Sequence, residues 1–457
     1  MSAESLNPEQ QADAPTLNPE QAHALALMDS GANVILTGGA GTGKSTVIHA
    51  YQQSTSRKVA IIAPTGAAAS RIGGTTIHRT FQFHSSLFLP SYEPALSEET
   101  QELLQALDTL IIDEVSMVRA DLLQAIDLSL RAANGNDLPF GGKQVILVGD
   151  LYQLPPVARD EEAEILQECY GGILPFFAPA WEEGKFQPVI LNEVHRQADP
   201  VFIGLLNAIR TGGFCPVPGI INWKSDWVKA VDRLNQLLTI SSFSVPHDAV
   251  VLCATNDIAK AINHTRDSEL RCPRQLFLAR TSGRVDFREL PVEPSLYVRV
   301  GSRIIMLANK VVSETSNVEY NNGDQGTLLA IEENSLDIQL DRGMIVRVGR
   351  QLWEFKKLHY DRSRQIIHHE VIGRTWQFPV KLGYAISIHK SQGQSLNRVH
   401  LSLARPMFAP GQAYTALSRC RSLAGLSLSR PLRYDDVLSN PEVEAFYASL
   451  TAHSDSD

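Results

Sequence analysis

The segment GGAGTGKST at residues 38–46 constrains the fold more strongly than any other part of the chain. It follows the apolar run NVILTG and precedes a stretch with helical patterning, which is the context of a phosphate-binding loop. Its glycines allow backbone N–H groups to turn toward phosphate oxygens, and the helix N-terminus adds a favourable dipole. In such a loop Lys44 neutralises the β- and γ-phosphates, and Ser45 coordinates Mg²⁺. The segment therefore predicts a nucleoside triphosphate site.

Short apolar runs alternate with helical stretches along most of the chain. In the first half, the strand candidates lie at residues 33–38, 58–66, 109–114, 144–150 and 188–194. Strands separated by helices are typical of βαβ units, so we expect an α/β fold with a mostly parallel sheet. Runs at 249–256, 302–309 and 399–404 have the same character and predict a second such unit. Residues 311–379 instead alternate apolar with polar residues between Gly and Asn turns, which indicates a small antiparallel insert.

The composition is that of a globular protein with more than one domain. A chain of 457 residues is too long for one compact core, and 44% hydrophobic residues leave ample material for buried sheets. No apolar run reaches eighteen residues, and the polar N-terminus lacks the pattern of a signal or transit peptide, so we expect no membrane span. The five cysteines are scattered and never spaced as CxxC, which favours reduced thiols in the cytoplasm over a zinc module.

The charge is unevenly distributed. The net charge is −9, with acids gathered in the N-terminal tail, at 93–108 and at 160–168. Between Arg342 and Arg405, by contrast, twelve Lys and Arg residues stand against three acids. A basic region on an acidic chain suits a polyanion such as nucleic acid, and it is equally consistent with a solvated basic face.

Two acids end the apolar run in LIIDEVS at 110–116. An acid at the end of a buried strand is expected beside the phosphate loop, where Asp113 would belong to the Mg²⁺ shell and Glu114 would orient or deprotonate the attacking water. A carboxylate pair that only caps the next helix is the alternative. The upstream phosphate loop favours the catalytic interpretation.

Three further polar residues follow runs of core-type residues. Gln153 in GDLYQLPPV is held by a paired-proline turn, and a contact from its side chain to a γ-phosphate would be lost after hydrolysis. Arg196 in LNEVHRQ and Arg419 in YTALSRCRS would stabilise the transition state if a second lobe delivers them to the γ-phosphate. Taken singly, each motif is also explained by a surface turn or by a solvated arginine.

A second polar loop, SIHKSQGQS at 387–395, directly follows the apolar run LGYAI and lies in the basic region. It has the composition of a phosphate-holding segment, although the chain already has one at 38–46. A loop that merely caps a strand is the structural alternative. Two such elements in one chain predict that a nucleotide and a nucleic acid are both held between two lobes.

The complete set of motifs resembles one known family. In chain order the motifs are LNPEQ, GGAGTGKST, APTGAAA, GGTTIHRTF, IIDEVSM, PFGGKQVILVGDLYQLPPV, LNEVHRQ, GYAISIHKSQGQS and GQAYTALSRCRS. The set resembles that of Pif-type DNA helicases, RecD-like members of superfamily one branch B, over about residues 17–428. The resemblance implies two RecA-like P-loop lobes with parallel sheets, ATP and Mg²⁺ in the cleft between them, and single-stranded DNA lying across both. It also implies a small wedge insert in the first lobe and a small β-barrel insert in the second.

The same resemblance gives expected boundaries. They are a flexible leader at 1–16, a first lobe at 17–79 and 105–190, a wedge at 80–104, a second lobe at 191–310 and 380–440, a β-barrel-like insert at 311–379 and a C-terminal tail at 441–457.

The resemblance also implies a role for individual residues. The expected catalytic residues are Lys44, Asp113, Glu114, Gln153, Arg196 and Arg419, with Ser45 and Asp113 holding Mg²⁺. The expected nucleotide-binding residues are Gln21, which would read adenine, and Gly38, Gly39, Ala40, Gly41, Thr42, Gly43, Lys44, Ser45, Thr46, Gly393 and Gln394. The expected DNA-binding residues are Pro64, Thr65, Gly66, His78, Phe83, His389, Lys390, Ser391 and Gln392.

The expected wedge is rich in aromatic residues. Its aromatic side chains are Phe81, Phe83, His84, Phe88 and Tyr92. They suit stacking on bases, worth about 1–3 kcal/mol each. A small core within the protrusion is the alternative, and for most of these rings it is the better explanation.

The chain departs from the family pattern at a few positions. The family more often has Phe where this chain has Leu151 and Thr where it has Ser387. It also more often has Leu where this chain has Gln394 and Thr where it has Ser395. Ser387 keeps a hydroxyl, whereas the last two change side chains expected close to the nucleotide.

The activity implied is ATP-driven translocation on single-stranded DNA, 5′-to-3′ by resemblance. The substrates would be tailed or forked duplexes and folded DNA such as G-quadruplex or RNA–DNA structures, in replication, recombination or repair. We expect a monomer in the cytoplasm. The alternative is an ATPase switch that binds DNA or a partner without unwinding. A catalytically idle DNA-binding module is disfavoured by the intact set of Lys44, Asp113 and Glu114.

Overall fold

The structure, a computed structural model, describes residues 17–83, 87–213, 225–241, 245–246, 248–287, 290–311, 318–320, 322–361 and 366–454. The expected leader at 1–16 and His84 lie outside the described residues.

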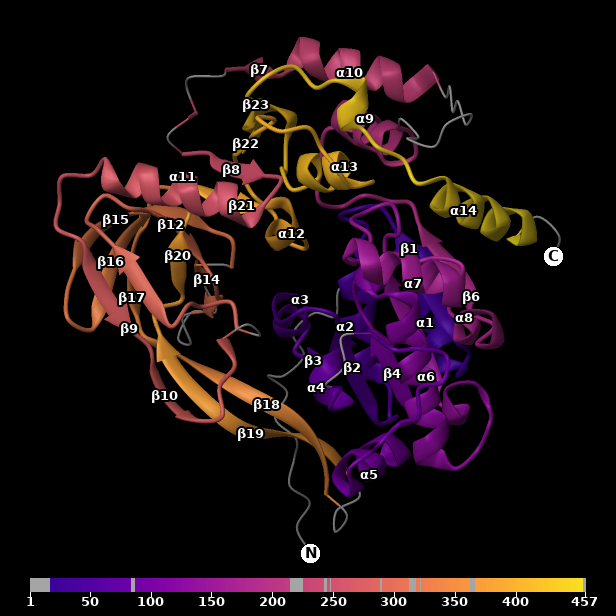
Figure 1. Cartoon of the computed structure of the whole chain (residues 1–457). Helices are drawn as coiled ribbons and strands as arrows, with labels where there is room; N and C mark the ends of the chain where they lie inside the picture. The colour runs from indigo at the N-terminus through magenta and orange to yellow at the C-terminus, as the bar shows by residue number, and fades with distance from the viewer. Residues whose placement is uncertain are drawn as a thin grey trace, which may run out of the picture.

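The first lobe is built on a six-stranded parallel sheet with the order β3-β2-β4-β5-β1-β6 (Figure 1). Its strands are β1 Val34–Gly38, β2 Val59–Ala63, β3 Thr75–Thr76, β4 Thr109–Ile112, β5 Gln144–Gly149 and β6 Gln187–Leu191. Its helices are α1 Pro19–Asp29, α2 Lys44–Ser54, α3 Gly66–Arg71, α4 Ile77–Thr80, α5 Glu98–Ala106, α6 Ala120–Asn134, α7 Asp160–Tyr170 and α8 Pro179–Glu183. Short 3₁₀ turns lie at Val115–Met117, Pro139–Gly142 and Pro175–Phe177. The five strands predicted in this half are confirmed.

The central strands of this sheet are apolar on both faces because helices cover both. Every residue of β1, β4 and β5 is buried. Along β4, Leu110 and Ile112 belong to one hydrophobic core and Ile111 to a second core on the opposite face. The carboxyl ends of these parallel strands therefore form a rigid edge on which the next polar residues are displayed.

The second lobe has its own parallel sheet, in the order β21-β8-β22-β23-β7. Its strands are β7 Thr239–Ile240, β8 Val250–Cys253, β21 Ala385–Ser387, β22 Val399–Leu401 and β23 Leu426–Leu428. Its helices are α9 Pro200–Arg210, α10 Ser225–Leu237, α11 Asn256–Ser268, α12 Ile388–Ser391 and α13 Gln412–Leu417, with 3₁₀ turns at Leu423–Gly425 and Tyr434–Asp436. The strands predicted at 249–256 and 399–404 are confirmed here.

A third group of strands is antiparallel and forms a small barrel-like unit beside the second lobe (Figure 1). Its main sheet has the order β17-β16-β15-β12-β20, and smaller sheets pair β9 with β11 and β13 with β14. The strands are β9 Gln275–Leu278, β11 Ser295–Val298, β12 Arg303–Met306, β13 Lys310–Val311, β14 Val318–Tyr320, β15 Gln325–Ile331, β16 Ser335–Leu340, β17 Ile345–Gly349 and β20 Val380–Leu382.

The prediction that 302–309 adds a strand to the second parallel sheet is wrong. Strand β12 pairs antiparallel with β15 and β20 in the barrel-like unit. All four of its residues are buried, and the last three, residues 304–306, form an apolar run. A strand buried on both faces has this appearance in either kind of sheet, and periodicity alone does not separate the two.

Two long strands leave the barrel-like unit as an arm. Strands β18 Gln351–Asp361 and β19 Ile366–Gln377 pair along their whole length, and β10 Arg280–Gly283 adds to β19. Figure 1 shows this arm crossing toward α5 of the first lobe. Near its base, the Arg79 guanidinium lies 3.2 Å from the centroid of the Phe355 ring, which joins α4 to β18. The arm therefore contacts the first lobe although it belongs to the insert.

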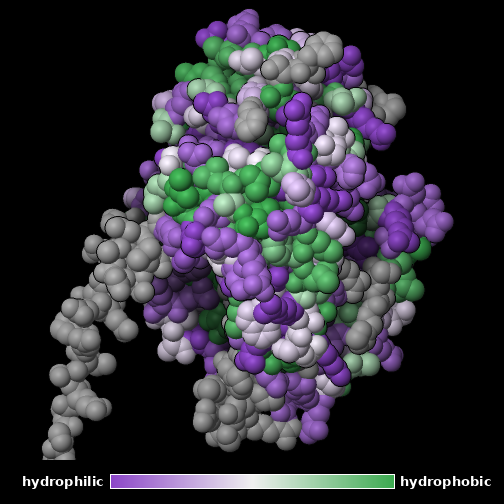
Figure 2. Space-filling view, turned by 90° about the vertical axis from the view of Figure 1, so that its left-hand side faces the viewer, coloured by the Kyte–Doolittle hydropathy of each residue, from purple (hydrophilic) through white to green (hydrophobic). Residues whose placement is uncertain are grey.

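The outer face of the barrel-like unit mixes apolar and charged residues. Figure 2 faces this side of the molecule and shows hydrophobic side chains gathered in patches between hydrophilic ones. Leu276, Leu278 and Ile345 are among the exposed apolar residues of these strands. Of the expected basic region, Arg342, Arg347, Arg374 and Arg398 form ion pairs with neighbouring acids, which favours a solvated face at these positions.

The segment expected as a wedge packs into the first lobe instead of forming a core of its own. Phe81, Phe83 and Phe88 are buried in the same hydrophobic core as the strands of the first sheet, together with Leu103 and Leu104 of α5. The Phe83 ring stacks on Phe81 with centroids 5.2 Å apart and contacts Phe88 at 4.7 Å. The aromatic residues of this segment therefore anchor it to the lobe.

The C-terminal segment, expected as a tail, forms helix α14 Pro441–Ser454 and returns to the first lobe (Figure 1). Val443 and Tyr447 are buried in the first lobe's core, and the Phe446 ring stacks on Phe176 with centroids 4.7 Å apart. The Tyr447 ring stacks on Tyr152 at 4.5 Å. Among the described residues, no helix has the length and apolar character needed to cross a membrane.

We predict that Tyr447→Ala lowers the stability of the first lobe by about 3–5 kcal/mol, because it removes a large buried aromatic side chain. Thermal unfolding followed by circular dichroism would measure the change. Ser449→Ala, at an exposed position of the same helix, is the matched control and should leave the melting temperature nearly unchanged. Equal melting temperatures for the two variants would show that α14 contributes little to the lobe.

Candidate nucleotide and nucleic-acid site

A cleft of about 540 Å³ lies between the two lobes, a volume within the range of small-molecule sites. Its lining residues are Ala40, Gly41, Thr42, Gly43, Lys44, Ser45, Thr46, Arg71, Asp113, Glu114, Gln153, His195, Arg196, Gly393, Ser395, Arg419 and Arg421. The structure thus brings all six expected catalytic residues to one cleft, although they span residues 44 to 419 of the chain.

The phosphate loop connects β1 to α2 in a conformation that depends on glycine. Gly41 and Gly43 both have φ of +85°, in the left-handed region that L side chains rarely adopt. A Cβ at Gly41 would also lie 2.4 Å from the Cβ of Arg196, so the loop packs directly against the segment that leads into the second lobe. The backbone of His195 closes this contact by donating to the Gly41 carbonyl at 2.8 Å.

Lys44 is held inside this loop. Its Nζ donates to the carbonyl oxygens of Gly38 at 2.8 Å and Gly39 at 3.0 Å. Burial lowers the pKa of Lys44 to about 8, against the opposing effect of Asp150 and Glu114. A phosphate group in the cleft would place a negative charge beside the buried ammonium of Lys44, whose hydrogen bonds within the described part of the chain are to carbonyl oxygens.

The two acids lie at the end of β4, as the sequence predicts. Asp113 donates its backbone N–H to the Ile62 carbonyl at 2.9 Å, which fixes it to the neighbouring strand β2. Glu114 has a φ of 53°, a left-handed conformation that directs its side chain into the cleft. Burial and the adjacent Glu114 raise the pKa of Asp113, whereas Arg71 acts in the opposite direction.

Arg71, at the end of α3, contacts both acids and was not among the expected site residues. Its Nη2 donates to Asp113 Oδ2 at 3.1 Å and to Glu114 Oε1 at 2.9 Å. No motif in the sequence distinguishes this arginine from a solvated one that follows a short helix.

Within the part of the chain that the structure describes, no ion pair joins Arg196 or Arg419 to an acid. Arg196 and Arg419 are both expected at the γ-phosphate, and the Arg196 Nη1 atom is buried without a hydrogen-bond partner in the described residues. Burial lowers the pKa of Arg196, and burial together with Arg196 lowers the pKa of Arg419. This uncompensated positive charge suits an anion.

The arrangement fits a nucleoside triphosphate with Mg²⁺. Ser45 and Asp113 both line the cleft and would hold the ion, which would neutralise charge on the phosphates. No group of three or more His, Cys, Asp or Glu residues suited to a metal occurs among the described residues.

Two glutamines expected at the nucleotide already have partners. Gln21 forms the capping box of α1 with Asn18, and its Nε2 donates to the Thr42 carbonyl at 3.3 Å. Gln153 lies in the cleft with its Nε2 3.4 Å from Asp150 Oδ2. The adenine contact of Gln21 and the γ-phosphate contact of Gln153 stay predictions.

The second polar loop reaches the cleft, but not with every residue in its expected place. Gln392, expected at DNA, donates from Nε2 to Glu114 Oε2 at 3.3 Å and so lies on the nucleotide side. Ser391, also expected at DNA, is buried with its hydroxyl donated to the Ile388 carbonyl. Gly393 lines the cleft, whereas the Gln394 side chain donates to the Lys390 carbonyl. The turn after α12 directs these side chains, and its geometry is not readable from residue types.

The remaining expected DNA-binding residues form two groups. Pro64, Thr65 and Gly66 are half-buried where β2 passes into α3, and His78 is exposed on α4. On the second lobe, Lys390 is exposed and His389 half-buried on α12. Phe83 is the exception, since at 8% exposure its ring packs against protein and is not presented to bases in this structure. Its expected contact with DNA stays a prediction.

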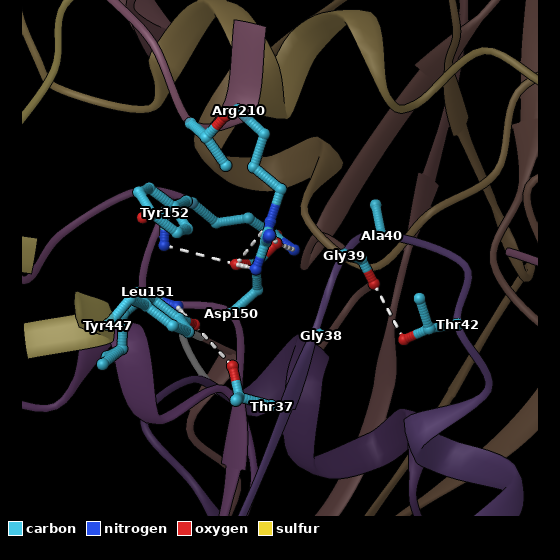
Figure 3. A network of polar contacts seen from close by, with 12 residues as sticks. Thr37, Gly38, Gly39, Ala40, Thr42, Asp150, Leu151, Tyr152, Arg210 and Tyr447 are labelled. Carbon is cyan, nitrogen blue, oxygen red and sulfur yellow. Dashed lines mark hydrogen bonds and ion pairs between the residues drawn. The ribbon is translucent and has the colours of Figure 1, made fainter. Parts of the chain in front are cut away.

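A buried polar network joins both lobes and α14 beneath the cleft (Figure 3). Asp150, at the end of β5, accepts from Arg210 of α9 at 2.9 Å and from the Tyr414 hydroxyl of α13 at 3.1 Å. The Tyr414 hydroxyl in turn accepts the backbone N–H of Ala40 in the phosphate loop at 2.8 Å. Tyr447 of α14 completes the network, with its hydroxyl 2.5 Å from Thr37 Oγ1. The network was not predicted, and its only sequence signal is an acid directly after a buried strand.

Comparisons with known proteins agree with this geometry. The family profile of PIF1-like helicases matches residues 16–210. The ATP-dependent DNA helicase Pif1 of Bdellovibrio bacteriovorus is 30% identical, over 94% of this chain and 91% of that relative. The chain belongs to the PIF1-like helicase family. The resemblance inferred from the motifs is thereby confirmed. The human ATP-dependent DNA helicase PIF1 is 34% identical, and this chain spans 64% of its length.

Solved Pif1 structures share the whole fold. Bacteroides sp Pif1 in complex with ADP-AlF4 has a TM-score of 0.84 at 31% identity, over 96% of this chain and 98% of that one. Bacteroides Pif1 bound to ssDNA covers the same share of each chain at 31% identity, but with a TM-score of 0.68. The α/β class with two RecA-like lobes is therefore confirmed, and the present conformation is closer to the first of these structures.

We predict that Asp150→Asn destabilises the protein by about 3–5 kcal/mol, because it leaves Arg210 buried without a charged partner. Burial alone would raise the pKa of Asp150, but Arg210 and Lys44 lower it, so its net shift is downward. Its stabilising effect is therefore present above the unfolded pKa of about 3.9 and is lost as pH falls through the lower folded value.

Urea unfolding of both proteins at pH 7 and near pH 3 would measure this effect. The gap between the unfolding midpoints of wild type and Asp150→Asn should be large at pH 7 and smaller in acid. Asp29→Asn, exposed at the end of α1, is the control and should match wild type. A gap that does not depend on pH would contradict the assignment of charge to Asp150.

Proposed function

We propose that this chain is an ATP-dependent DNA helicase that translocates 5′-to-3′ on single-stranded DNA and opens tailed or forked duplexes. The observation that carries the proposal is the cleft itself, which is lined by the phosphate loop, by the acids Asp113 and Glu114, and by Arg196 and Arg419. The division into lobes, insert and C-terminal helix is part of the proposal. So are a monomeric state, a cytoplasmic setting and DNA contacts at Thr65, His78, His389 and Lys390.

Hydrolysis follows from the side chains that line the cleft. Lys44 would exchange its two carbonyl partners for phosphate oxygens, which offset the charge of the buried ammonium better than carbonyl dipoles do. Glu114 would accept the proton of the attacking water or orient it. Arg196 and Arg419 would stabilise the negative charge of the transition state, which ties hydrolysis to closure of the cleft.

Movement on DNA follows from where the two polar segments lie. Thr65 directly precedes α3 on the first lobe, and Lys390 lies on α12 of the second lobe, so a bound strand would contact both lobes. A change in cleft width with each ATP cycle would alter the spacing of these two contacts. Because the Bacteroides structure bound to ssDNA is less similar to the present conformation, we expect DNA binding to rearrange the domains.

The proposal is tested by strand displacement with ATP on matched duplexes that carry either a 5′ or a 3′ single-stranded tail. We expect unwinding of the 5′-tailed duplex alone. Unwinding only from a 3′ tail would keep the helicase and overturn the direction. ATP hydrolysis without displacement of either strand would replace the proposal with a DNA-binding ATPase switch.

We predict that Arg419→Ala leaves ATP binding near normal but reduces hydrolysis on the order of a thousandfold, since an arginine at the γ-phosphate acts mainly in the transition state. Fluorescent nucleotide binding and phosphate release would measure the two effects separately. Arg433→Ala, an arginine that does not line the cleft, is the control. Unchanged turnover in Arg419→Ala would remove this residue from the catalytic set.

A further inference from the structure

The contacts of Arg71 bridge the nucleotide cleft from one lobe to the other. Besides Asp113 and Glu114, the guanidinium abuts the second-lobe loop, because a Cβ at Gly393 would lie 1.5 Å from Arg71 Nη1. Gln392 of that loop donates to the second oxygen of Glu114. Arg71, Gln392 and Gly393 therefore enclose the catalytic carboxylates from both lobes, and we call this arrangement the Arg71 clamp.

We propose that the Arg71 clamp is an inhibitory contact that holds the catalytic acids of the DNA-free enzyme and is released when DNA binds. The proposal rests on the helicase function proposed above and adds the regulation of its ATP site. Arg71 occupies the oxygen atoms of Asp113 and Glu114 that hydrolysis requires, so it competes with magnesium-bound nucleotide for them.

Electrostatics support a competition of this kind. The Arg71 side chain is 31% exposed, whereas Asp113 is 5% exposed. A guanidinium and a hydrated Mg²⁺ both neutralise a buried carboxylate, and the arginine is the only one of the two that is already tethered to the lobe. Release of the clamp would break the hydrogen bonds from Arg71 Nη2 to Asp113 Oδ2 and to Glu114 Oε1. Opening the clamp therefore costs free energy, because these contacts to the acids must break.

The chain connects the clamp directly to the expected DNA contacts. Helix α3 begins at Gly66, beside Thr65, and ends at Arg71, so its six residues span roughly 9 Å. Thr65 caps this helix by accepting from the Ala68 N–H at 3.3 Å. On the second lobe, Lys390 lies only two residues before Gln392. A strand held by both segments would therefore pull on both sides of the clamp.

The closest alternative gives Arg71 the opposite effect. An arginine beside Glu114 would also serve as a positioning residue that orients the catalytic carboxylate or stabilises the transition state. In that case its removal would slow hydrolysis whether or not DNA is present. The two possibilities differ in the sign of the effect on the DNA-free rate.

The test compares wild type with Arg71→Ala and Arg71→Lys. ATP hydrolysis is measured without DNA and with saturating oligo(dT), and binding of a fluorescent ADP analogue is titrated with Mg²⁺. For Arg71→Ala we expect a DNA-free rate about tenfold higher, which corresponds to a net change of about 1.4 kcal/mol. The rate with DNA should change less, and the Mg²⁺ midpoint for nucleotide binding should fall several-fold. Arg71→Lys, which keeps the charge but not the forked contact, should be intermediate.

The control is Arg57→Ala, which should match wild type in every assay. Arg57 precedes β2 and lies at the other end of that strand from α3. A lower DNA-free rate in Arg71→Ala, or an unchanged Mg²⁺ midpoint, would overturn the clamp. If Arg71→Ala failed to fold, it would lose nucleotide binding in the equilibrium titration. Arg71→Lys would then serve as the second variant that tests the clamp. Wild-type ATP hydrolysis that does not respond to oligo(dT) would overturn the release of the clamp by DNA, whereas the helicase function is tested separately by strand displacement.

Discussion

The buried pair of Asp150 and Arg210 is the contact on which the arrangement of the lobes depends. Asp150 directly follows β5, a central strand of the first sheet, and Arg210 ends α9 of the second lobe. Burying either charge alone would cost free energy. The side chain from each lobe therefore compensates the charge that the other lobe buries. If the lobes moved so that these two side chains separated, each buried charge would lose its partner. The free-energy cost of burying that charge would then no longer be offset.

The same pair also reaches the phosphate loop. Tyr414 links Asp150 to the Ala40 backbone, so the loop is held by a side chain of the second lobe before any nucleotide contact forms. Lys44 is bound to loop carbonyls, and Glu114 is held by Arg71 and Gln392. Lys44 and Glu114 thus already have protein partners, and binding of substrate would replace these partners.

The sequence predicted those features that depend on local pattern. The phosphate loop, the acids after β4 and the parallel strands follow from glycine spacing and from apolar runs, which are properties of short segments. The sequence did not predict features that depend on which distant segments pair or pack against one another in the tertiary structure. Strand β12 has the pattern of a parallel strand, and only its pairing partners reveal the barrel-like unit.

Helix α14 and Arg71 illustrate two kinds of miss. In α14, Val443, Phe446, Tyr447 and Leu450 follow the spacing of one helical face, so the helix was readable, although the lobe that it covers was not. Arg71 carried no comparable signal, because its significance comes from Asp113, Glu114 and Gly393, which lie 42 or more residues away.

The return of α14 to the first lobe has a mechanical consequence. The chain crosses between the lobes once after β6, on the way to α9, and again between residue 436 and α14 (Figure 1). A body attached at one point can swivel in any direction, whereas a body attached at two points turns only about the line that joins them. The two crossings therefore act like a pair of door hinges, and they restrict the lobes to opening and closing along a single arc.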